Sequence, residues 1–402
     1  MNRLGILVLS ATTGFVSGAA WAENSVTLYG IVDAGIQYNS DVAVAQNIGA
    51  AGRPVNYASK GRLGFQSGAD YGDRWGLKGV EDLGDGYTAI FQLENWFNIG
   101  NGALNVSSST LWGRQGYMGL NSTRYGTLTF GRQYDVTNDL VEYYGPDSAG
   151  GIGTYPGDLS NFDGSIRINN SIKYRTPTID HLTGEIVYGF GGVAGSAWRN
   201  STLSVGANYV AGPVAVGAAY MRMDNSGATG NTWSSASADS NFGSSVTAGF
   251  AGARAVQTAN AIAAYTFGTL MLGVNYGYTQ YRPSALSSFH QVVAYNSAGI
   301  AMRYQYSTTM SFALSPTYTR GQSVGDGKAR PWYASIAGVG FYNLSKRTSF
   351  YLYGGYQRAG GDTFDAFGNL VAATPSLGDA ANGSSSGSRN QALIRIGMFN
   401  KF

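Results

Sequence analysis

The last eleven residues, ALIRIGMFNKF at Ala392–Phe402, alternate apolar side chains with more polar ones. In an extended strand, one face carries Ala392, Ile394, Ile396, Met398 and Phe402, and the other carries Arg395, Gly397, Phe399 and Lys401. An exposed final strand of this kind would be prone to aggregate in water. In a closed membrane barrel it completes the sheet, with its apolar face toward lipid and its polar face toward a wet interior.

The first 22 residues, 1–22, have the features of a secretory signal peptide. They begin with a basic residue, Arg3, continue with an apolar stretch around Leu4–Leu9, and end on the tripeptide AWA at 20–22. A membrane anchor would need about 20 apolar residues in a row, whereas polar residues and glycines interrupt this segment. We therefore expect cleavage after residue 22, which leaves one exported domain over residues 23–402.

The composition of the mature chain does not suit a nucleic-acid-binding protein or an ordinary soluble domain. Without Arg3, the 26 Lys and Arg residues fall to 25 against 23 Asp and Glu, a formal net charge of about +2. Charged residues make up 12% of the chain against about 25% in soluble domains, and the 59 glycines and 28 tyrosines exceed normal usage. No nucleic-acid partner is expected, and so few charges would make a soluble protein hard to keep in solution.

The chain contains no cysteine, which excludes a disulfide framework, thiolate chemistry and cysteine-bound metals. After the signal segment, the nearest thing to a spanning helix is Ala261–Val274, AIAAYTFGTLMLGV. This stretch is too short to cross a bilayer and contains a Phe-Gly-Thr turn between two alternating runs. The sequence therefore does not indicate a helical membrane protein.

Alternating segments of about ten residues, joined by very short turns on one side and long polar loops on the other, are typical of outer-membrane barrels. Sixteen such segments can be counted in this chain. They are Ser25–Asp41, Asp73–Leu83, Tyr87–Asn98, Leu111–Ser122, Gly126–Tyr134, Ile168–Pro177, Leu182–Gly191, Ser201–Gly212, Val214–Asp224, Arg254–Gly268, Leu270–Tyr281, Tyr295–Ser307, Thr308–Gly321, Trp332–Arg347, Thr348–Gly360 and Ala392–Phe402. An even number places both chain ends on the same, periplasmic side.

The connections between these segments fall into two classes of length. Tight turns are expected at Gly84-Asp85-Gly86, Ala211-Gly212-Pro213, Gly268-Thr269 and Ser345–Thr348. Long loops rich in Gly, Ser and Asn are expected outside the cell at Val42–Gly72, Asp135–Arg167, Asn225–Ala253 and Gly361–Gln391. The predicted fold class is all-β, a transmembrane antiparallel β-barrel of 16 strands with a polar, water-filled interior.

Several longer strings closely resemble the general, trimeric porins of Gram-negative bacteria, of the betaproteobacterial type. They are DRWGLKGVEDLG at Asp73–Gly84, AIFQLE at Ala89–Glu94, GRQ at Gly131–Gln133, YNLSKRT at Tyr342–Thr348, and the terminal Phe402. The resemblance covers nearly the whole mature chain. It implies a homotrimer in the outer membrane, in contact with outer-membrane lipid and lipopolysaccharide. It also implies passive diffusion of small hydrophilic solutes and ions, with no cofactor and no enzymatic activity.

In porins of this kind the third outer loop folds back into the lumen and narrows it, with acids on the loop facing basic residues on the wall. The matching loop here is Asp135–Arg167. Its acids, with no basic residue before Arg167, are Asp135, Asp139, Glu142, Asp147, Asp158 and Asp163. Its glycine-rich part, Gly145–Gly157, allows the backbone to fold tightly against the wall.

The opposing basic wall follows from which face of each strand turns inward. If Trp75 and Leu77 face lipid or a neighbouring subunit, Arg74 and Lys78 face the lumen. Arg114 precedes a Gln-Gly-Tyr-Met run that resembles the arginine-bearing strand of porins. The candidates for the basic wall are Arg74, Lys78, Arg114, Lys173, Arg175 and Arg395, with Arg74 and Arg114 the leading pair. The alternative for each is a place in the wide, solvated part of the lumen.

Two positions concern assembly rather than permeation. With Leu128 and Phe130 outward, Arg132 also faces outward, at a candidate contact between subunits, unless a bulge turns it inward. Phe402 resembles the terminal signal that the barrel-assembly machinery reads. Asn400 departs from that signal, which usually has an aromatic residue or histidine at this place.

Enzymatic and metal sites are not indicated. The two histidines, His181 and His290, fall on opposite sides of the membrane in this topology, so they cannot share a metal or a catalytic relay. A barrel hydrolase would need a histidine beside a serine or an acid, and an adhesin or structural barrel would not conduct. An energy-coupled transporter would need a plug domain before the first strand. A substrate-specific channel would carry a solute-binding ladder in the same barrel.

A basic wall and an acidic loop across a narrow wet gap predict a filter by size and by charge. The field between them orders water and disfavours apolar solutes, which cannot replace that water. A slightly basic lumen would favour anions. We therefore expect a general diffusion pore with weak anion selectivity.

Overall fold

The structure is a computed structural model that describes residues 24–48, 54–68, 70–105, 110–322, 330–378 and 384–402. The expected signal segment, 1–22, lies outside the described residues. The strands are β1 (Ser25–Ile48), β2 (Pro54–Ser67), β3 (Arg74–Gly84), β4 (Tyr87–Trp96), β5 (Gln115–Ser122), β6 (Gly126–Tyr134), β7 (Arg167–Arg175), β8 (Leu182–Gly189), β9 (Thr202–Ala211), β10 (Val214–Asp224), β11 (Ala255–Phe267), β12 (Leu270–Arg282), β13 (Val293–Gln305), β14 (Met310–Gly321), β15 (Trp332–Asn343), β16 (Thr348–Gly360), β17 (Asp362–Phe364), β18 (Leu370–Ala372) and β19 (Asn390–Lys401). Short helical turns include η2 (Thr137–Val141), η3 (Glu142–Tyr144), η4 (Pro146–Ala149), η5 (Gly151–Gly153), η6 (Pro156–Asp158) and η7 (Ala248–Phe250).

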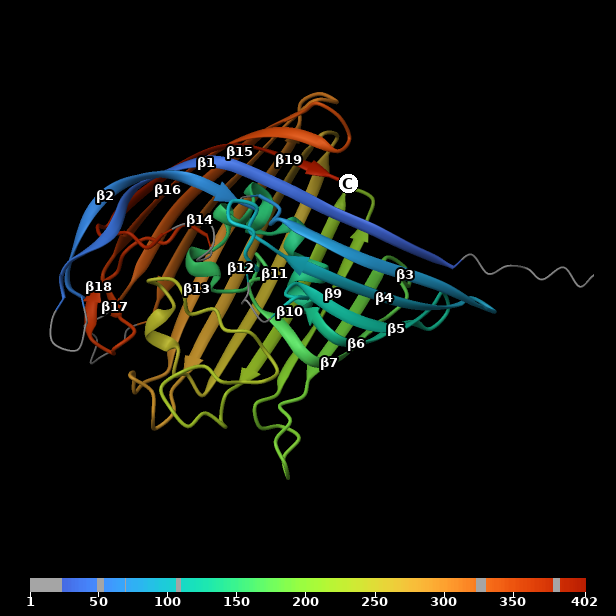
Figure 1. Ribbon diagram of the computed structural model, residues 1–402, viewed down its shortest axis with the longest axis horizontal. Coiled ribbons are helices and arrows are strands. Elements are labelled where there is room, and N and C mark those ends of the chain that lie inside the picture. The colour runs from blue at the N-terminus through green and yellow to red at the C-terminus, as the bar shows by residue number, and fades with distance from the viewer. Residues whose placement is uncertain (1–23, 49–53, 69, 106–109, 323–329, 379–383) are drawn as a thin grey trace, which may run out of the picture.

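Seventeen of these strands form one antiparallel sheet that closes into a barrel (Figure 1). β1 closes it, because one edge pairs with β19 and the other with β2 and β3. β3 pairs with the first residues of β1, β2 pairs with its later residues, and the segment 68–73 interrupts the sheet between them. β2 and β3 thus share one position, and the barrel has the sixteen strand positions that the sequence predicts.

Alternation along the strands produces an apolar outer surface, as the last strand shows. Ile394 and Ile396 are 59% and 61% exposed, whereas Arg395 between them is 1% exposed. Gly30 and the terminal Phe402 exchange two backbone hydrogen bonds at 3.0 Å, which fixes the closing register. Large apolar side chains at such exposure are stable against lipid, while the inward face needs water or polar partners.

The two ends of the barrel differ in the length of their connections. β1 begins and β19 ends at the upper right of Figure 1, and the long loops lie at the opposite, lower left end. Among the tight turns, Gly268 has a φ of +59°, which an L-residue with a Cβ rarely adopts. Among the described residues, no helix combines the length and the apolarity needed to cross a bilayer.

The expected long loop at Val42–Gly72 is the main error of the sequence-based topology. β1 continues to Ile48 and pairs with β2 from Pro54 onward, so most of this stretch is strand rather than loop. The hairpin rests on the last outer loop, where Val42 and Ser386 form an isolated bridge. Apolar alternation in this stretch is limited to short runs such as Leu63 and Phe65 on β2, which are too short for periodicity to mark two strands.

The loop between β6 and β7 crosses the interior of the barrel (Figure 1). Tyr155 donates a 2.7 Å hydrogen bond from its hydroxyl to Asn275 on β12, and Ser315 on β14 donates one of 3.0 Å to the carbonyl of Gly153. Gly150, with a φ of +68°, lies so close to Tyr353 on β16 that a Cβ would collide with its hydroxyl. The glycine-rich part of the loop therefore packs directly against the far wall, as expected.

Other outer loops pack into the outer half of the barrel. Phe250, in the loop between β10 and β11, stacks on Tyr281 of β12 with ring centroids 4.4 Å apart. Phe289 packs edge-on against the same Phe250 at 5.2 Å. These rings belong to a buried apolar cluster that also includes Tyr295 and Tyr333 from the inner wall. The outer half of the lumen is consequently narrower than the strand geometry alone would make it.

Candidate functional site

A cavity of about 1430 Å³ lies inside the barrel, between the loop that follows β6 and the periplasmic turns. Its lining comes from β3, β4, β6 and β7, from β11 to β16, from β19, from the loop that follows β6, and from residues 68 and 70–72. Arg114, just before β5, also lines it. The charged residues of the lining are the basic Arg74, Arg114, Arg167, Arg303, Lys346 and Lys401 and the acidic Asp70, Glu142, Asp147 and Asp163. Cations outnumber acids, and both occur around the same space.

One wall of the cavity carries three arginines from neighbouring strands. Arg74 begins β3 and Arg114 precedes β5, and both guanidinium groups approach Glu94 of β4, at 4.0 and 2.8 Å. Arg167 begins β7 and donates a 3.2 Å hydrogen bond to the hydroxyl of Tyr134. The structure thus places Arg74 and Arg114, the leading pair predicted from the sequence, at the cavity. It adds a third arginine, Arg167, which the sequence analysis used only as the end of the loop.

Aromatic rings hold two of these arginines, Arg114 and Arg167, in position. The guanidinium of Arg114 lies 5.6 Å from the ring centroid of Trp96 and 5.8 Å from that of Tyr134. Arg167 lies 5.2 and 5.0 Å from the same two rings. Stacking of this kind fixes the side chains without neutralising their charge, so the positive potential still reaches the lumen.

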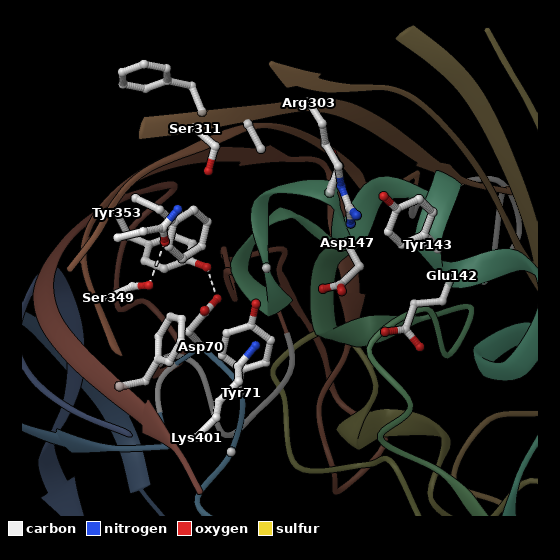
Figure 2. Close-up of a pocket in the computed structure, with 18 of the residues that line it drawn as sticks. Asp70, Tyr71, Glu142, Tyr143, Asp147, Arg303, Ser311, Ser349, Tyr353 and Lys401 are labelled. Carbon is white, nitrogen blue, oxygen red and sulfur yellow. Dashed lines mark hydrogen bonds between the residues drawn. The ribbon is translucent and has the colours of Figure 1, made fainter. Parts of the chain in front are cut away.

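The loop acids divide into two groups. Glu142, Asp147 and Asp163 line the cavity, and Figure 2 shows the first two beside Arg303 and Tyr143. The guanidinium of Arg303 lies 4.3 Å above the Tyr143 ring. Arg303 was not among the sequence candidates, although strand alternation between Met302 and Tyr304 would have turned it inward.

The other three loop acids make contacts within the protein and do not line the cavity. Asp135 is fully buried and accepts backbone hydrogen bonds of 3.3 Å from Thr137 and Asn138. Asp158 accepts one of 3.1 Å from Asp163 and is 1% exposed. Asp139 forms an ion pair with Lys173 on β7. These contacts shape and anchor the loop, whereas the sequence expectation placed all six acids across the gap.

The remaining basic candidates also lie away from the cavity lining. Lys173 bridges Asp139 and Glu185, the latter at 3.5 Å, and Arg175 approaches Glu185 at 3.8 Å. Arg395 is 1% exposed and donates a 2.7 Å hydrogen bond to Gln37. Lys78 is exposed, with its ammonium 5.6 Å from the ring centroid of Tyr29. Lys173 is thus paired with two acids, and Arg395 is buried against Gln37 and the Tyr353 ring, so neither side chain lines the cavity.

The interruption between β2 and β3 adds a second inward segment that the sequence did not indicate. Asp33 of β1 accepts hydrogen bonds from the backbone N–H groups of Asp70 and Tyr71, at 2.6 and 3.0 Å. The Asp70 carboxylate accepts a hydrogen bond from Tyr353, and Lys401 lies 4.0 Å above the Tyr71 ring (Figure 2). Asp70 lies between β2 and β3, outside both strands, so strand periodicity could not place it at the cavity.

Burial makes several acids of the cavity hard to ionise. It raises the pKa of Asp70 to about 7 despite the hydrogen bond from Tyr353. Burial, together with the surrounding acids Asp163 and Asp158, raises the pKa of Glu142 well above its ordinary value. The pKa of Asp147 is raised in the same way by burial and by Glu142, with Arg303 opposing the shift. Near neutral pH the cavity is therefore more positive than a count of its residues indicates.

Replacing Lys173 by glutamine is expected to destabilise the loop anchor. Burial alone would raise the pKa of Asp139, but the Lys173 ammonium outweighs it and holds that pKa below its ordinary value. Without the ammonium, Asp139 and Glu185 would face each other as buried acids. Removing one partner of a buried ion pair typically costs about 3–5 kcal/mol, so we expect a clearly lower Tm in detergent. Lys78→Gln is the matched control, since Lys78 is exposed, and equal loss of Tm in both variants would contradict the anchor.

Arg132 has its guanidinium engaged within the subunit. It forms a two-pronged ion pair with Asp239 of an outer loop, at 2.8 and 2.6 Å, and also donates to the carbonyl of Gly113. The pairing of β6 with β7 shifts register between Gly131 and Gln133, so a bulge does occur at this position. The expected contact with another subunit is untested.

The described residues contain no group of His, Cys, Asp or Glu side chains arranged to hold a metal ion. His181 and His290 lie in separate connections, before β8 and before β13.

Comparison with protein-family models matches residues 7–362 to the Gram-negative porins. The chain belongs to the Gram-negative porin family. This porin is therefore a barrel of the Gram-negative outer membrane, and the family is not enzymatic.

Curated relatives of the porin come from betaproteobacteria. It is 36% identical to an outer membrane porin protein of Bordetella pertussis, over 55% of this chain and 60% of that protein. It is 32% identical to outer membrane porin protein 32 of Delftia acidovorans, over 47% and 49%, and 31% identical to major outer membrane protein P.IA of Neisseria meningitidis, over 46% of each. The porin thus spans about half the length of the curated relatives it matches.

Solved structures share the barrel over almost the whole length of the porin. An anion-selective porin from Comamonas acidovorans has a TM-score of 0.65 at 22% identity, covering 94% of this chain and 100% of that one. The trimer form of OmpT, an outer membrane protein of Vibrio cholerae, has a TM-score of 0.59 at 14% identity, covering 94% and 99%. At such identities the likeness establishes the fold alone.

Proposed function

We propose that this porin is a general diffusion pore for small hydrophilic solutes and ions, with a weak preference for anions. The observation that carries the proposal is the excess of cations in the cavity, six basic against four acidic side chains. Three of the acids, Asp70, Glu142 and Asp147, also have raised pKa values, so their negative charge is reduced near neutral pH. A wet passage lined in this way attracts anions and raises their local concentration.

The site residues divide by role in this proposal. Arg74, Arg114 and Arg167 attract anions on one wall, and Glu142, Asp147 and Asp163 limit that attraction from the loop. Asp135, Asp139 and Asp158 keep the loop in place. A structural neighbour is named as anion-selective, which is consistent with the proposed sign.

The porin is proposed to act as a homotrimer. Family membership supports this, and a structural neighbour has been solved in a trimer form. Phe402 is proposed as the residue that the barrel-assembly machinery reads, since it ends the strand that closes the sheet.

A salt-gradient experiment tests both the proposed pore and its preference for anions. Purified porin in a planar bilayer of neutral lipid should give stepwise conductance, and the reversal potential in a KCl gradient should have the sign of chloride permeation. Absence of conductance would contradict the pore, and a potassium preference would contradict the proposed selectivity.

The second candidate function is a channel for a restricted class of solutes. The packing of Phe250 and Phe289 against the inner wall favours it, because it narrows the outer half of the lumen. Such a channel should show current block by one anionic solute at rising concentration. Equal, weak responses to many solutes would favour general diffusion.

A further inference from the structure

The chain between β2 and β3 leaves the sheet and enters the barrel. This part of the chain, residues 68 and 70–73, is here called the inward segment. It forms a closed turn, because the N–H of Gly72 donates a 3.1 Å hydrogen bond to the carbonyl of Gly68. The N–H of Gly68 in turn donates one of 2.8 Å to the carbonyl of Asp33 on β1. The cavity is therefore lined by this turn as well as by the loop that follows β6.

Two fully buried aspartates, Asp33 and Asp73, hold the inward segment in place. The Asp33 carboxylate accepts hydrogen bonds from the N–H groups of Asp70 and Tyr71, at 2.6 and 3.0 Å. It accepts a further one, of 2.7 Å, from the hydroxyl of Tyr351 on β16. The Asp73 carboxylate accepts one of 2.5 Å from the N–H of Asp33. Because a buried carboxylate is costly to leave unpaired, these bonds fix the backbone of the inward segment within the lumen.

The inward segment lies between the arginines of the wall and the loop that follows β6. On one side, the carbonyl of Gly72 accepts a 3.1 Å hydrogen bond from Nε of Arg74. A Cβ added at Gly72 would also lie 3.0 Å from Nη1 of Arg114. On the other side, a Cβ added at Gly150 of the loop would lie 3.1 Å from the Asp70 carboxylate. The inward segment is therefore at the same level of the lumen as the leading arginines and the glycine-rich part of the loop.

Tyr71 presents an aromatic ring to the cavity from the inward segment. Its side chain lines the cavity, and the residue is 36% exposed. Phe399 packs edge-on against the ring at 4.8 Å, and the ammonium of Lys401 lies 4.0 Å above it. Figure 2 shows the Tyr71 hydroxyl directed toward the space that Asp147 and Arg303 border from the other side. Since Phe399 and Lys401 both belong to β19, the ring is supported by the wall and its free edge faces the lumen.

We propose that Tyr71 sets the size limit of the pore, opposite the loop that follows β6. This inference rests on the proposed diffusion pore and adds to it a residue that selects solutes by width rather than by charge. Asp33 and Asp73 fix the backbone and β19 supports the ring, so Tyr71 is held in the path of a solute. A solute must fit between this ring and the loop side chains that line the same cavity, such as Tyr143 and Asp147. The diameter of a pore at its narrowest section limits the solutes that pass.

Swelling of porin-containing liposomes in neutral sugars of increasing size tests this role. In Tyr71→Ala, the rate for a trisaccharide relative to a pentose should rise several-fold, and the single-channel conductance should rise about twofold, because the narrowest section becomes wider. Tyr71→Trp places a larger ring at the same point and should lower both quantities. The chloride-to-potassium permeability ratio should change less than about twofold in either variant, since no charged group is removed. A ring that only packed against β19 would lower the Tm in both variants without moving the sugar ratio in opposite directions.

The lack of cysteine in the chain allows a second, independent test. Tyr71→Cys supplies a single thiol at the narrow section, and a bulky, neutral methanethiosulfonate reagent converts it to a mixed disulfide. The current through single pores should then fall by about half, because the attached group fills the passage. The matched control is Tyr318→Cys, since Tyr318 is 49% exposed between the buried Thr317 and Thr319 on β14 and does not line the cavity. The same reagent should leave the current of this control unchanged.

Two results would overturn the role of Tyr71 while leaving the diffusion pore intact. One is a parental sugar ratio in both Tyr71→Ala and Tyr71→Trp. The other is an undiminished current in Tyr71→Cys after a mass shift has confirmed labelling, or an equal loss of current in Tyr318→Cys. A parent porin without any conductance would instead contradict the proposed function, and this inference with it.

Discussion

Replacing Arg74 and Arg114 together by alanine is expected to shift the selectivity of the pore from anions toward cations. Two of the six basic charges of the cavity are lost, and Glu94, which pairs with both, becomes uncompensated. A charge at about 6 Å contributes about 0.7 kcal/mol at a water-like dielectric constant. Loss of two such charges raises the energy of an anion and lowers that of a cation by about 1.4 kcal/mol each, so the anion-to-cation permeability ratio falls by up to about a hundredfold. Freed Glu94 adds to the shift in the same direction.

Reversal potentials in a KCl gradient measure this change. Arg320→Ala, Arg358→Ala is the control with equal loss of charge, since both side chains lie on the outer surface. In neutral lipid this control should retain parental selectivity. If Arg74→Ala, Arg114→Ala left the reversal potential unchanged, the two arginines would not control permeation.

A rise in pH is expected to weaken the preference for anions. Burial raises the pKa of Asp70 to about 7, and burial and neighbouring acids raise the pKa values of Glu142 and Asp147 well above their ordinary values. A carboxyl with a raised pKa is neutral below that pKa and negative above it. When the pH of the measurement is raised from 6 to 9, the cavity therefore gains negative charge, beginning with Asp70 near pH 7. The permeability ratio should fall several-fold over this range, a change similar in size to removal of one arginine.

A combined variant identifies the groups responsible for the pH response. Asp70→Asn, Glu142→Gln, Asp147→Asn keeps the shape of the three side chains and removes their titration. We expect selectivity in this variant to be nearly independent of pH between 6 and 9, at the anion preference that the parent shows at acid pH. A full parental pH response in the variant would assign the titration to other groups, and Asp163 would be the next to replace.

Much of the fold could be predicted from the sequence, because alternation on a strand is a local property. In β19, apolar residues at every second position required lipid on one side. The contrast between tight turns and long loops predicted which end of each strand faces the periplasm. The one topological error, at Val42–Gly72, lies where the apolar alternation of the β1–β2 hairpin is limited to a few residues such as Leu63 and Phe65. No side-chain period marks such a hairpin.

The site was predicted in part. Arg74 follows from its place on an alternating strand and Arg114 from the resemblance of the strand after it, and both line the cavity. Arg303 could have been found in the same way as Arg74, from the alternation of β13. Glu142, Asp147 and Asp163 line the cavity, but Asp135, Asp139 and Asp158 do not.

The sequence alone determined that this chain forms a barrel, which face of most strands meets lipid, and that the lumen is polar. Only the tertiary structure decided which charges meet across the lumen. Asp70 reaches the cavity through an irregular break between β2 and β3, and Lys173 is neutralised by a loop acid 34 residues earlier in the chain. Alternation sets the direction of a side chain within its own strand, whereas the partner of a charge depends on how distant segments pack inside the closed barrel.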